Sequence, residues 1–264
     1  MDYCNLNKMP NYGDPQYWED RYKESAGKVF EWLEDFSAIE SLIFKFLSEN
    51  PLFPEDSTEW KKDAKILNLG CGNSTIAEDL YDKGLISTVN MDISTEVIKQ
   101  MSDRNLEKRP ELQWHVMDVR EMTYDDNTFD LIIDKSTIDA ILCGDNAFIN
   151  TAQMMRECQR VLKTGGIYMG ISYGYPESRV LHYKRAHLHM ELRVFEIQPQ
   201  NPKDSLHYVY VCKKLEGADE ISKQNYEKVE NDIREDERKM IELYYKQQKS
   251  KGVGVGPADQ QQQE

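Results

Sequence analysis

Residues 65 to 74 read KILNLGCGNS, and residues 88 to 92 read TVNMD. The apolar run before Gly70 predicts a short strand that is buried on both faces of a parallel sheet. Gly70 and Gly72 permit a sharp turn, which lets a ligand lie close to the backbone. The two stretches therefore predict a strand, a glycine turn, a helix and a second strand in that order.

The second strand ends in an acidic residue whose spacing from the glycine turn is typical of a nucleoside-binding site. Asn73, Ser74 and Thr75 are suitable N-cap residues for the intervening helix. Asp92 follows 20 residues after Gly72. A carboxylate at that place can accept hydrogen bonds from both hydroxyls of a ribose. The alternative is an ordinary strand-to-helix turn followed by a surface aspartate.

The glycine pattern separates two kinds of nucleoside cofactor. A dinucleotide fingerprint has a third glycine three residues after Gly72, where the pyrophosphate approaches the helix. That position is Thr75. A Gly-x-Gly turn without the third glycine suits a cofactor that has no pyrophosphate. The pattern resembles motif I of the class I methyltransferases that use S-adenosylmethionine (SAM), with Asp92 as the acidic residue of motif II.

Composition narrows the range of partners. The 264 residues carry a formal net charge of −14, and 39% of them are hydrophobic. An acidic protein is poorly suited to hold phosphate backbones, and it attracts basic partners. The five cysteines show no zinc spacing, and neither an apolar leader nor an 18-residue apolar run is present. We expect a protein of a reducing compartment, the cytoplasm, that has no membrane-spanning segment.

The chain alternates strands and helices, which predicts a doubly wound α/β fold with a seven-stranded, mostly parallel sheet. We expect the strands at 66–69, 88–92, 112–118, 129–135, 166–173, 190–198 and 206–213, the last two as an antiparallel pair. We expect helices near 14–22, 36–48, 76–81, 94–106, 137–143 and 147–162. Lys163 to Gly166 should cap the last of these helices. We divide the chain into a flexible N-terminus (1–13), the main domain (14–215) and a charged helical and disordered tail (216–264).

Several candidate site residues also have a purely structural interpretation. Trp18 and Tyr22 share one helical face, and with Trp32 they could form either an aromatic lid or part of the core. Asp118 ends the third strand and could bind a ligand or cap the strand end. Lys135 follows the fourth strand and could be a site residue or a surface lysine. The five histidines lack ligand spacing, so we expect no metal.

A resemblance to a known family rests on a set of short motifs. These are YW and RY at 17–22, EW at 31–32, LGCGNS at 69–74, MDVR at 117–120, FD at 129–130 and DKSTIDA at 134–140. Together they resemble the small eukaryotic lysine methyltransferases that act on translation elongation factor 1-alpha. The resemblance covers residues 11 to 214, and it departs from the family at Ser136, where the family has glycine.

The resemblance implies which residues hold SAM. They are Trp18, Tyr22, Trp32, Gly70, Asp92, Ile93, Asp118, Val119 and Lys135. It further implies methyl transfer to a lysine of a basic protein, elongation factor 1-alpha. A lysine has a pKa near 10.4 in water and must lose its proton before it can accept a methyl group. An aromatic channel would favour the neutral amine, and the candidates to form it are Tyr22, Trp32, Lys135 and Asp139.

The general base stays unassigned, because Asp139 lies in an expected helix and could simply cap or orient. Two other functions stay open. One is a methyltransferase for nucleic acid or a small molecule. The other is a non-catalytic interaction subunit whose tail binds another protein.

Overall fold

The computed structural model describes residues 10–25, 27–50, 52–54, 56–198, 205–223 and 226–250. The chain divides into two compact units, Met1–Gln224 and Asn225–Glu264, and each is described by itself. The expectations for 1–9 and for 251–264 lie outside the described residues. Within the described residues, no helix combines the length and the apolar character needed to cross a bilayer.

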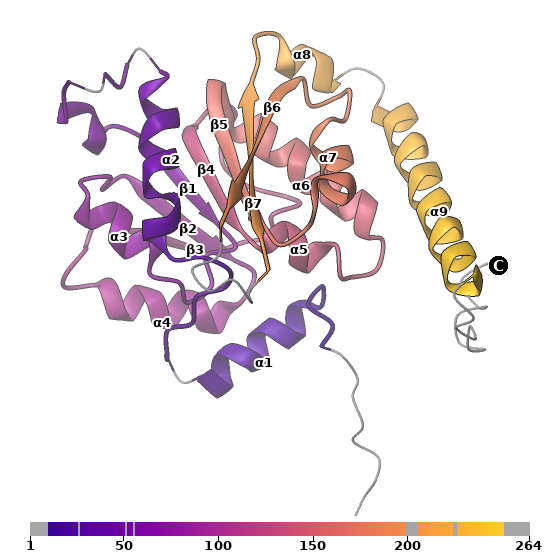
Figure 1. Ribbon diagram of the computed structural model, residues 1–264. Coiled ribbons are helices and arrows are strands. Elements are labelled where there is room, and N and C mark those ends of the chain that lie inside the picture. Colours follow the sequence, from indigo (N-terminus) through magenta and orange to yellow (C-terminus); the bar gives the residue numbers. More distant parts are fainter. Residues whose placement is uncertain are drawn as a thin grey trace, which may run out of the picture. The chain divides into compact units, whose positions relative to one another are not determined.

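A seven-stranded sheet forms the centre of the first unit, with the strand order β3-β2-β1-β4-β5-β7-β6 (Figure 1). The strands are β1 (Ile66–Leu69), β2 (Thr88–Asp92), β3 (Gln113–Val116), β4 (Phe129–Lys135), β5 (Leu162–Ser172), β6 (Met190–Ile197) and β7 (His207–Lys214). β7 pairs antiparallel with β5 and β6, and all other pairs are parallel. The predicted fold class is therefore confirmed, including the terminal antiparallel pair.

Helices cover both faces of this sheet. In the first unit they are α1 (Pro15–Ser25), α2 (Phe36–Ser48), α3 (Ile76–Asp82), α4 (Thr95–Asn105), α5 (Thr137–Ile141), α6 (Ala147–Val161), α7 (Pro176–Tyr183) and α8 (Ala218–Lys223). A short 3-10 helix spans Glu59–Lys62. The second unit holds α9 (Tyr226–Ser250).

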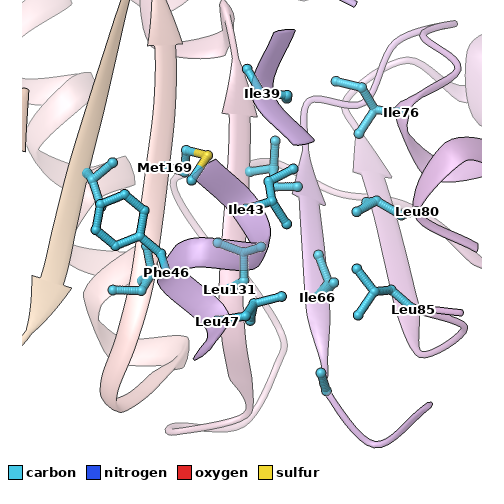
Figure 2. Close-up of a cluster of buried hydrophobic side chains, with 14 of the residues drawn as sticks. Ile39, Ile43, Phe46, Leu47, Ile66, Ile76, Leu80, Leu85, Leu131 and Met169 are labelled. Atoms are coloured by element: carbon cyan, nitrogen blue, oxygen red, sulfur yellow. The ribbon is translucent and has the colours of Figure 1, made fainter. Parts of the chain in front are cut away.

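Helix α2 shows how the apolar pattern becomes core. Asp35 caps it by accepting a hydrogen bond from the Ser37 N–H at 2.9 Å. Ile39 and Ile43 are spaced four residues apart and point from α2 toward the sheet, where they belong to the same hydrophobic cluster as Leu131 of β4 (Figure 2). Residues of α3 complete this cluster. The opposite face of the sheet is covered by α6 and α7, through a second cluster that contains Met154, Met155, Tyr168 and Tyr183.

Two local expectations were wrong. Lys163 to Gly166 do not cap α6 but belong to β5, where the pairing with β4 shifts register between Phe129 and Leu131. Long-range sheet pairing overrides the local turn signal there, and the extra residues form a bulge. The sequence analysis also missed α7, which has Pro176 at its first turn.

The first unit extends past residue 215. The Lys214 ammonium, fully buried, lies 2.7 Å from the Asp219 carboxylate of α8. It also donates to the Asn127 side chain at 2.9 Å and to the Leu162 carbonyl at 2.7 Å. Helix α8, placed in the tail by the sequence analysis, thus packs on the sheet domain.

Candidate cofactor-binding site

A cavity of about 370 Å³ lies at the carboxyl ends of the parallel strands, and its size is typical of small-molecule sites. Its walls come from the N-terminal segment, the glycine turn after β1, the ends of β2 and β4, the loop after β3 and α5. The structure brings together at this cavity Trp18, Tyr22, Trp32, Gly70, Asp92, Ile93, Asp118, Val119, Lys135 and Asp139. Their placement matches the sequence analysis, while their contacts with a ligand stay predictions.

The glycine turn is shaped by two close neighbours. Gly70 has φ of 59°, and a Cβ atom on it would lie 2.1 Å from the Thr137 hydroxyl. That hydroxyl donates to the Leu69 carbonyl at 3.0 Å. A Cβ atom on Gly72 would lie 2.7 Å from the Tyr22 hydroxyl. Glycine is therefore required at both positions to keep the turn this tight.

Asp92 is a buried carboxylate that is already oriented. Its Oδ2 accepts from the Gly72 N–H at 2.9 Å, and its Oδ1 accepts from the Ser94 N–H at 3.0 Å. Burial raises its pKa, and the two N–H groups only partly offset that effect. Among the described residues it has no cationic partner. Each oxygen keeps a lone pair, so the group fits a ligand that brings two hydroxyls.

Asp118 is engaged by a residue that the sequence analysis did not single out. Arg120 lies beside it with an Nη2–Oδ2 distance of 2.6 Å, and its Nε also contacts the carboxylate. Burial alone would raise the pKa of Asp118, but Arg120 outweighs this and lowers it. Asp118 is thus held ionised, and the charge strengthens it as an acceptor for an adenine amino group. An adenine would share this carboxylate with Arg120.

Aromatic rings from the N-terminal segment form one wall of the cavity. Trp18 donates from its Nε1 to the Tyr12 carbonyl at 2.7 Å. Its ring stacks on Tyr22 and meets Trp32 edge to face, both with centroids 6.0 Å apart. Tyr22 is only 5% exposed and belongs to a small buried cluster, whereas Trp18 is half-buried against it. The two interpretations, aromatic lid and core, therefore both apply to Tyr22, which is buried and also lines the cavity.

Several contacts attach this segment to the domain, among them the following two. Glu19 of α1 accepts from the Ser94 hydroxyl at 2.7 Å, at the start of α4. Gly13 lies against Gly144 on the far side of α5, since a Cβ atom on Gly13 would come within 2.3 Å of the Gly144 Cα. Both glycines line the cavity.

Residues 28–35, which we call the strap, cross from α1 to α2 and carry Trp32. The Lys135 ammonium donates to the Trp32 carbonyl at 2.9 Å, to the Glu34 carbonyl at 3.0 Å and to the Glu31 carboxylate. Lys135 is therefore not a surface lysine, since only 6% of its side chain is exposed. Burial lowers its pKa, and Glu31 partly opposes that effect.

Glu31 connects the strap to the glycine turn. Its carboxylate accepts from the Thr75 N–H at 2.6 Å, from the Thr75 hydroxyl at 3.2 Å and from the Ser74 hydroxyl at 2.8 Å. Thr75 is the position where a dinucleotide fingerprint has its third glycine. An anion from the chain itself thus lies where a pyrophosphate would approach, which fits a cofactor without one.

The segment after β4 holds the remaining candidates. Asp139 is buried and pairs with Arg179, with an Nη2–Oδ1 distance of 3.0 Å, and it accepts from the Ser172 hydroxyl. Its carboxylate is thus already engaged by Arg179 and Ser172. Ser136 has φ of 70°, a left-handed conformation that explains the glycine in the family pattern.

The sequence analysis missed several site residues. Tyr12, Arg120 and Tyr173 line the cavity, and Glu31 lies behind it. Glu31 adjoins Trp32 in the sequence, but its partners lie more than 40 residues away. In the described parts of the chain, no group of three or more His, Cys, Asp and Glu side chains is arranged to hold a metal.

The fold and site define a class I nucleoside-cofactor enzyme, and the cavity fits SAM. The unpaired Asp92 carboxylate suits the ribose, the ionised Asp118 suits the adenine, and the aromatic wall suits a sulfonium. Comparison with known proteins agrees. The sequence profile described as "Methyltransferase domain" matches residues 60–242. The chain belongs to this family of SAM-dependent methyltransferases, and SAM is its cofactor.

The chain is also similar to methyltransferases whose names specify a substrate. EEF1A lysine methyltransferase 4 of Mus musculus is 32% identical over 69% of this chain and 69% of its own length. The Bos taurus protein of the same name is 32% identical over 70% and 71%. The eEF1A lysine and N-terminal methyltransferase of Xenopus laevis is 35% identical, over 61% of this chain. This chain spans only 22% of that relative's length.

Solved structures agree on the fold. A TehB-like SAM-dependent methyltransferase from Corynebacterium glutamicum aligns with a TM-score of 0.50 and 18% identity, over 76% of this chain and 97% of its own. The [4+2]-cyclase SpnF aligns with a TM-score of 0.51 and 13% identity, over 70% and 84%. Since one of these neighbours is a cyclase, the fold alone does not fix the reaction.

Proposed function

We propose that this protein transfers a methyl group from SAM to a lysine side chain of a basic protein, with elongation factor 1-alpha as the first candidate. The observation that carries the proposal is the chemistry of the cavity wall. Aromatic rings of Trp18, Phe30, Trp32 and Tyr173 line it, and Lys135, which also lines it, directs its ammonium to the strap. Such a wall accepts a cationic side chain and then desolvates it. The names of the relatives and the net charge of −14 support the same substrate.

When bound, SAM supplies an already activated methyl group. The protein must therefore position the acceptor nitrogen and favour its neutral form. Burial between aromatic rings disfavours the ammonium form and lowers the pKa of the acceptor. Asp139 takes no proton in this scheme, because Arg179 and Ser172 occupy it. It orients the loop after β5 instead, because its carboxylate accepts a hydrogen bond from the Tyr173 N–H at 3.3 Å.

The loop after β5 extends the cavity wall toward the surface. Tyr173 and Tyr175 are 48% and 59% exposed, and Tyr175 packs on Tyr208 with ring centroids 5.6 Å apart. Glu196 pairs with Tyr208 across the sheet, and Glu177 begins α7 beside them. Exposed rings together with carboxylates suit the basic chain that would flank an acceptor lysine.

The test is methyl transfer to a defined protein. Purified protein is incubated with labelled SAM and purified elongation factor 1-alpha, and the labelled residue is identified by mass spectrometry. We expect methyl-lysine, and we expect no label with Asp92→Ala. In a parallel incubation in which a cell lysate replaces the purified factor, label on nucleic acid or on a small molecule instead of protein would contradict the proposal. Stable co-purification without any turnover would favour the interaction subunit.

A further inference from the structure

The partly buried pair of Lys135 and Glu31 uses all of its hydrogen-bonding capacity within the protein. A lysine ammonium has three donors, and those of Lys135 go to the Trp32 carbonyl, the Glu34 carbonyl and the Glu31 carboxylate. Each oxygen of Glu31 accepts two hydrogen bonds, from Thr75 on one side and from Ser74 and Lys135 on the other. Neither group has a donor or an acceptor left for a ligand.

The Lys135 and Glu31 pair anchors the strap. Besides the three bonds from Lys135, the strap is fixed at its start, where the Asn73 side-chain amide donates to the Lys28 carbonyl at 2.5 Å. It is fixed near its end, where Glu34 meets His207 of β7 at 2.7 Å. The Glu31 and Lys135 ion pair lies between these points and joins the strap to the end of β4. Through its hydrogen bonds with Ser74 and Thr75, Glu31 also joins the strap to the glycine turn.

The strap in turn supports the aromatic wall. Trp32 contacts Tyr12, Trp18 and Phe30 edge to face, at centroid distances of 6.0, 6.0 and 5.1 Å. The Arg21 guanidinium of α1 lies 5.1 Å from the Trp32 ring. A displacement of Trp32 would therefore remove the surface on which the first helix rests.

We propose that Lys135 and Glu31 are positioning residues: their side chains hold the strap and Trp32 over the cavity rather than bind the cofactor. The family resemblance implies that Lys135 binds SAM directly, so the two roles make different predictions. Loss of a direct ligand weakens SAM binding but leaves the strap in place in the protein without SAM. A positioning residue acts through Glu31, and its loss also frees the strap in the protein without SAM.

A double-mutant cycle with Lys135→Met and Glu31→Gln separates the roles. SAM affinity is measured by calorimetry for the full chain, the two single variants and the double variant. We expect each single variant to weaken SAM about tenfold, and the double variant to be no weaker than the worse single one, because groups in direct contact are strongly coupled. Should Lys135→Met not fold, Glu31→Gln alone still reports on the strap.

A second readout needs no cofactor. Trypsin cleavage between Lys28 and Val29, followed by mass spectrometry, reports release of the strap. We expect this cleavage to accelerate in each single variant before SAM is added. Both readouts are independent of the methyl acceptor, so they do not depend on the lysine substrate.

Lys214→Met is the matched control. Lys214 is also a buried lysine with three acceptors, Asp219, Asn127 and Leu162, but it does not line the cavity. Its loss should reduce stability and leave both SAM affinity and Lys28 cleavage unchanged. Additive losses of affinity with unchanged cleavage would overturn the proposal in favour of a direct ligand. An equal loss of affinity in Lys214→Met would overturn it in favour of general destabilisation.

Discussion

Asp92 combines burial, fixed orientation and the lack of a cationic partner within the described residues. Asp92→Asn should weaken SAM by about 1.5–3 kcal/mol, because hydrogen bonds to an ionised group are worth that much. Calorimetry with SAM measures the effect. Asp103→Asn is the control, since Asp103 lies on the exposed side of α4 and pairs with Lys99. Unchanged affinity in Asp92→Asn would mean that this carboxylate does not hold the ribose.

Asp134 should make stability depend on pH. Burial raises its pKa to about 7, from an ordinary value of 3.8, even though Tyr168 and the Thr137 N–H bond to it. A raised carboxyl pKa gives stability that is complete below the unfolded value and is lost as pH rises toward the folded value. Between these values the folded state holds a proton that the unfolded chain has released. The free energy of unfolding therefore falls by roughly 1.4 kcal/mol per pH unit.

The side-chain amide of the Asp134→Asn variant cannot titrate. The free energy of unfolding of this variant should therefore fall less steeply across this pH range than that of the wild-type protein. Denaturation by urea at several pH values, for both proteins, gives the two slopes. Parallel slopes would show that Asp134 stays ionised in the folded protein.

Single residues also show where prediction from sequence ends. Gly70 and Asp92 could be placed because a short buried strand fixes their position at the sheet edge. Glu31 could not, because its bonds to Ser74 and Lys135 span 43 and 104 residues. The same holds for Arg179, whose partner Asp139 lies 40 residues earlier. Long-range polar contacts leave no local pattern in a sequence.

At the scale of elements, α1 is both attached to the domain and part of the cavity wall. Trp18→Ala should weaken SAM binding while the melting temperature without SAM falls little, because Trp18 is only half-buried. Trp60→Ala is the matched control. Trp60 is 8% exposed and packs on Phe53 in the core, so its loss should cost about 3–5 kcal/mol and leave the SAM-induced shift intact. Thermal melts with and without SAM compare the two variants. A large loss of stability without ligand in Trp18→Ala would make Trp18 ordinary core.

Elements differed in how well their sequences predicted them. The α2 helix was predicted with its observed bounds, because its apolar residues recur at helical spacing between a cap and two prolines. The start of β5 was not, because Gly165 and Gly166 suggest a turn and only the pairing with β4 makes them strand. Sheet edges and bulges depend on neighbours that are distant in sequence.

For the whole molecule, the division into two units predicts where the chain can be shortened. A chain that ends at Lys223 should fold and bind SAM, since it keeps α8. A chain that ends at Leu215 loses Asp219 and leaves the Lys214 ammonium buried without its carboxylate. We expect it to be less stable by about 3 kcal/mol or more. Urea denaturation and SAM calorimetry of both chains test this, and equal stability would show that α8 contributes nothing.

The contact of Gly13 with Gly144 has a kinetic consequence. It joins two walls of the cavity, so the N-terminal segment would cover a nucleoside bound there. A protein acceptor that then docks beside Tyr173 would cover what opening remains. Substrates would therefore add in a compulsory order, the methyl donor first and the protein second. The demethylated nucleoside would leave last, and it would compete with the donor but not with the acceptor.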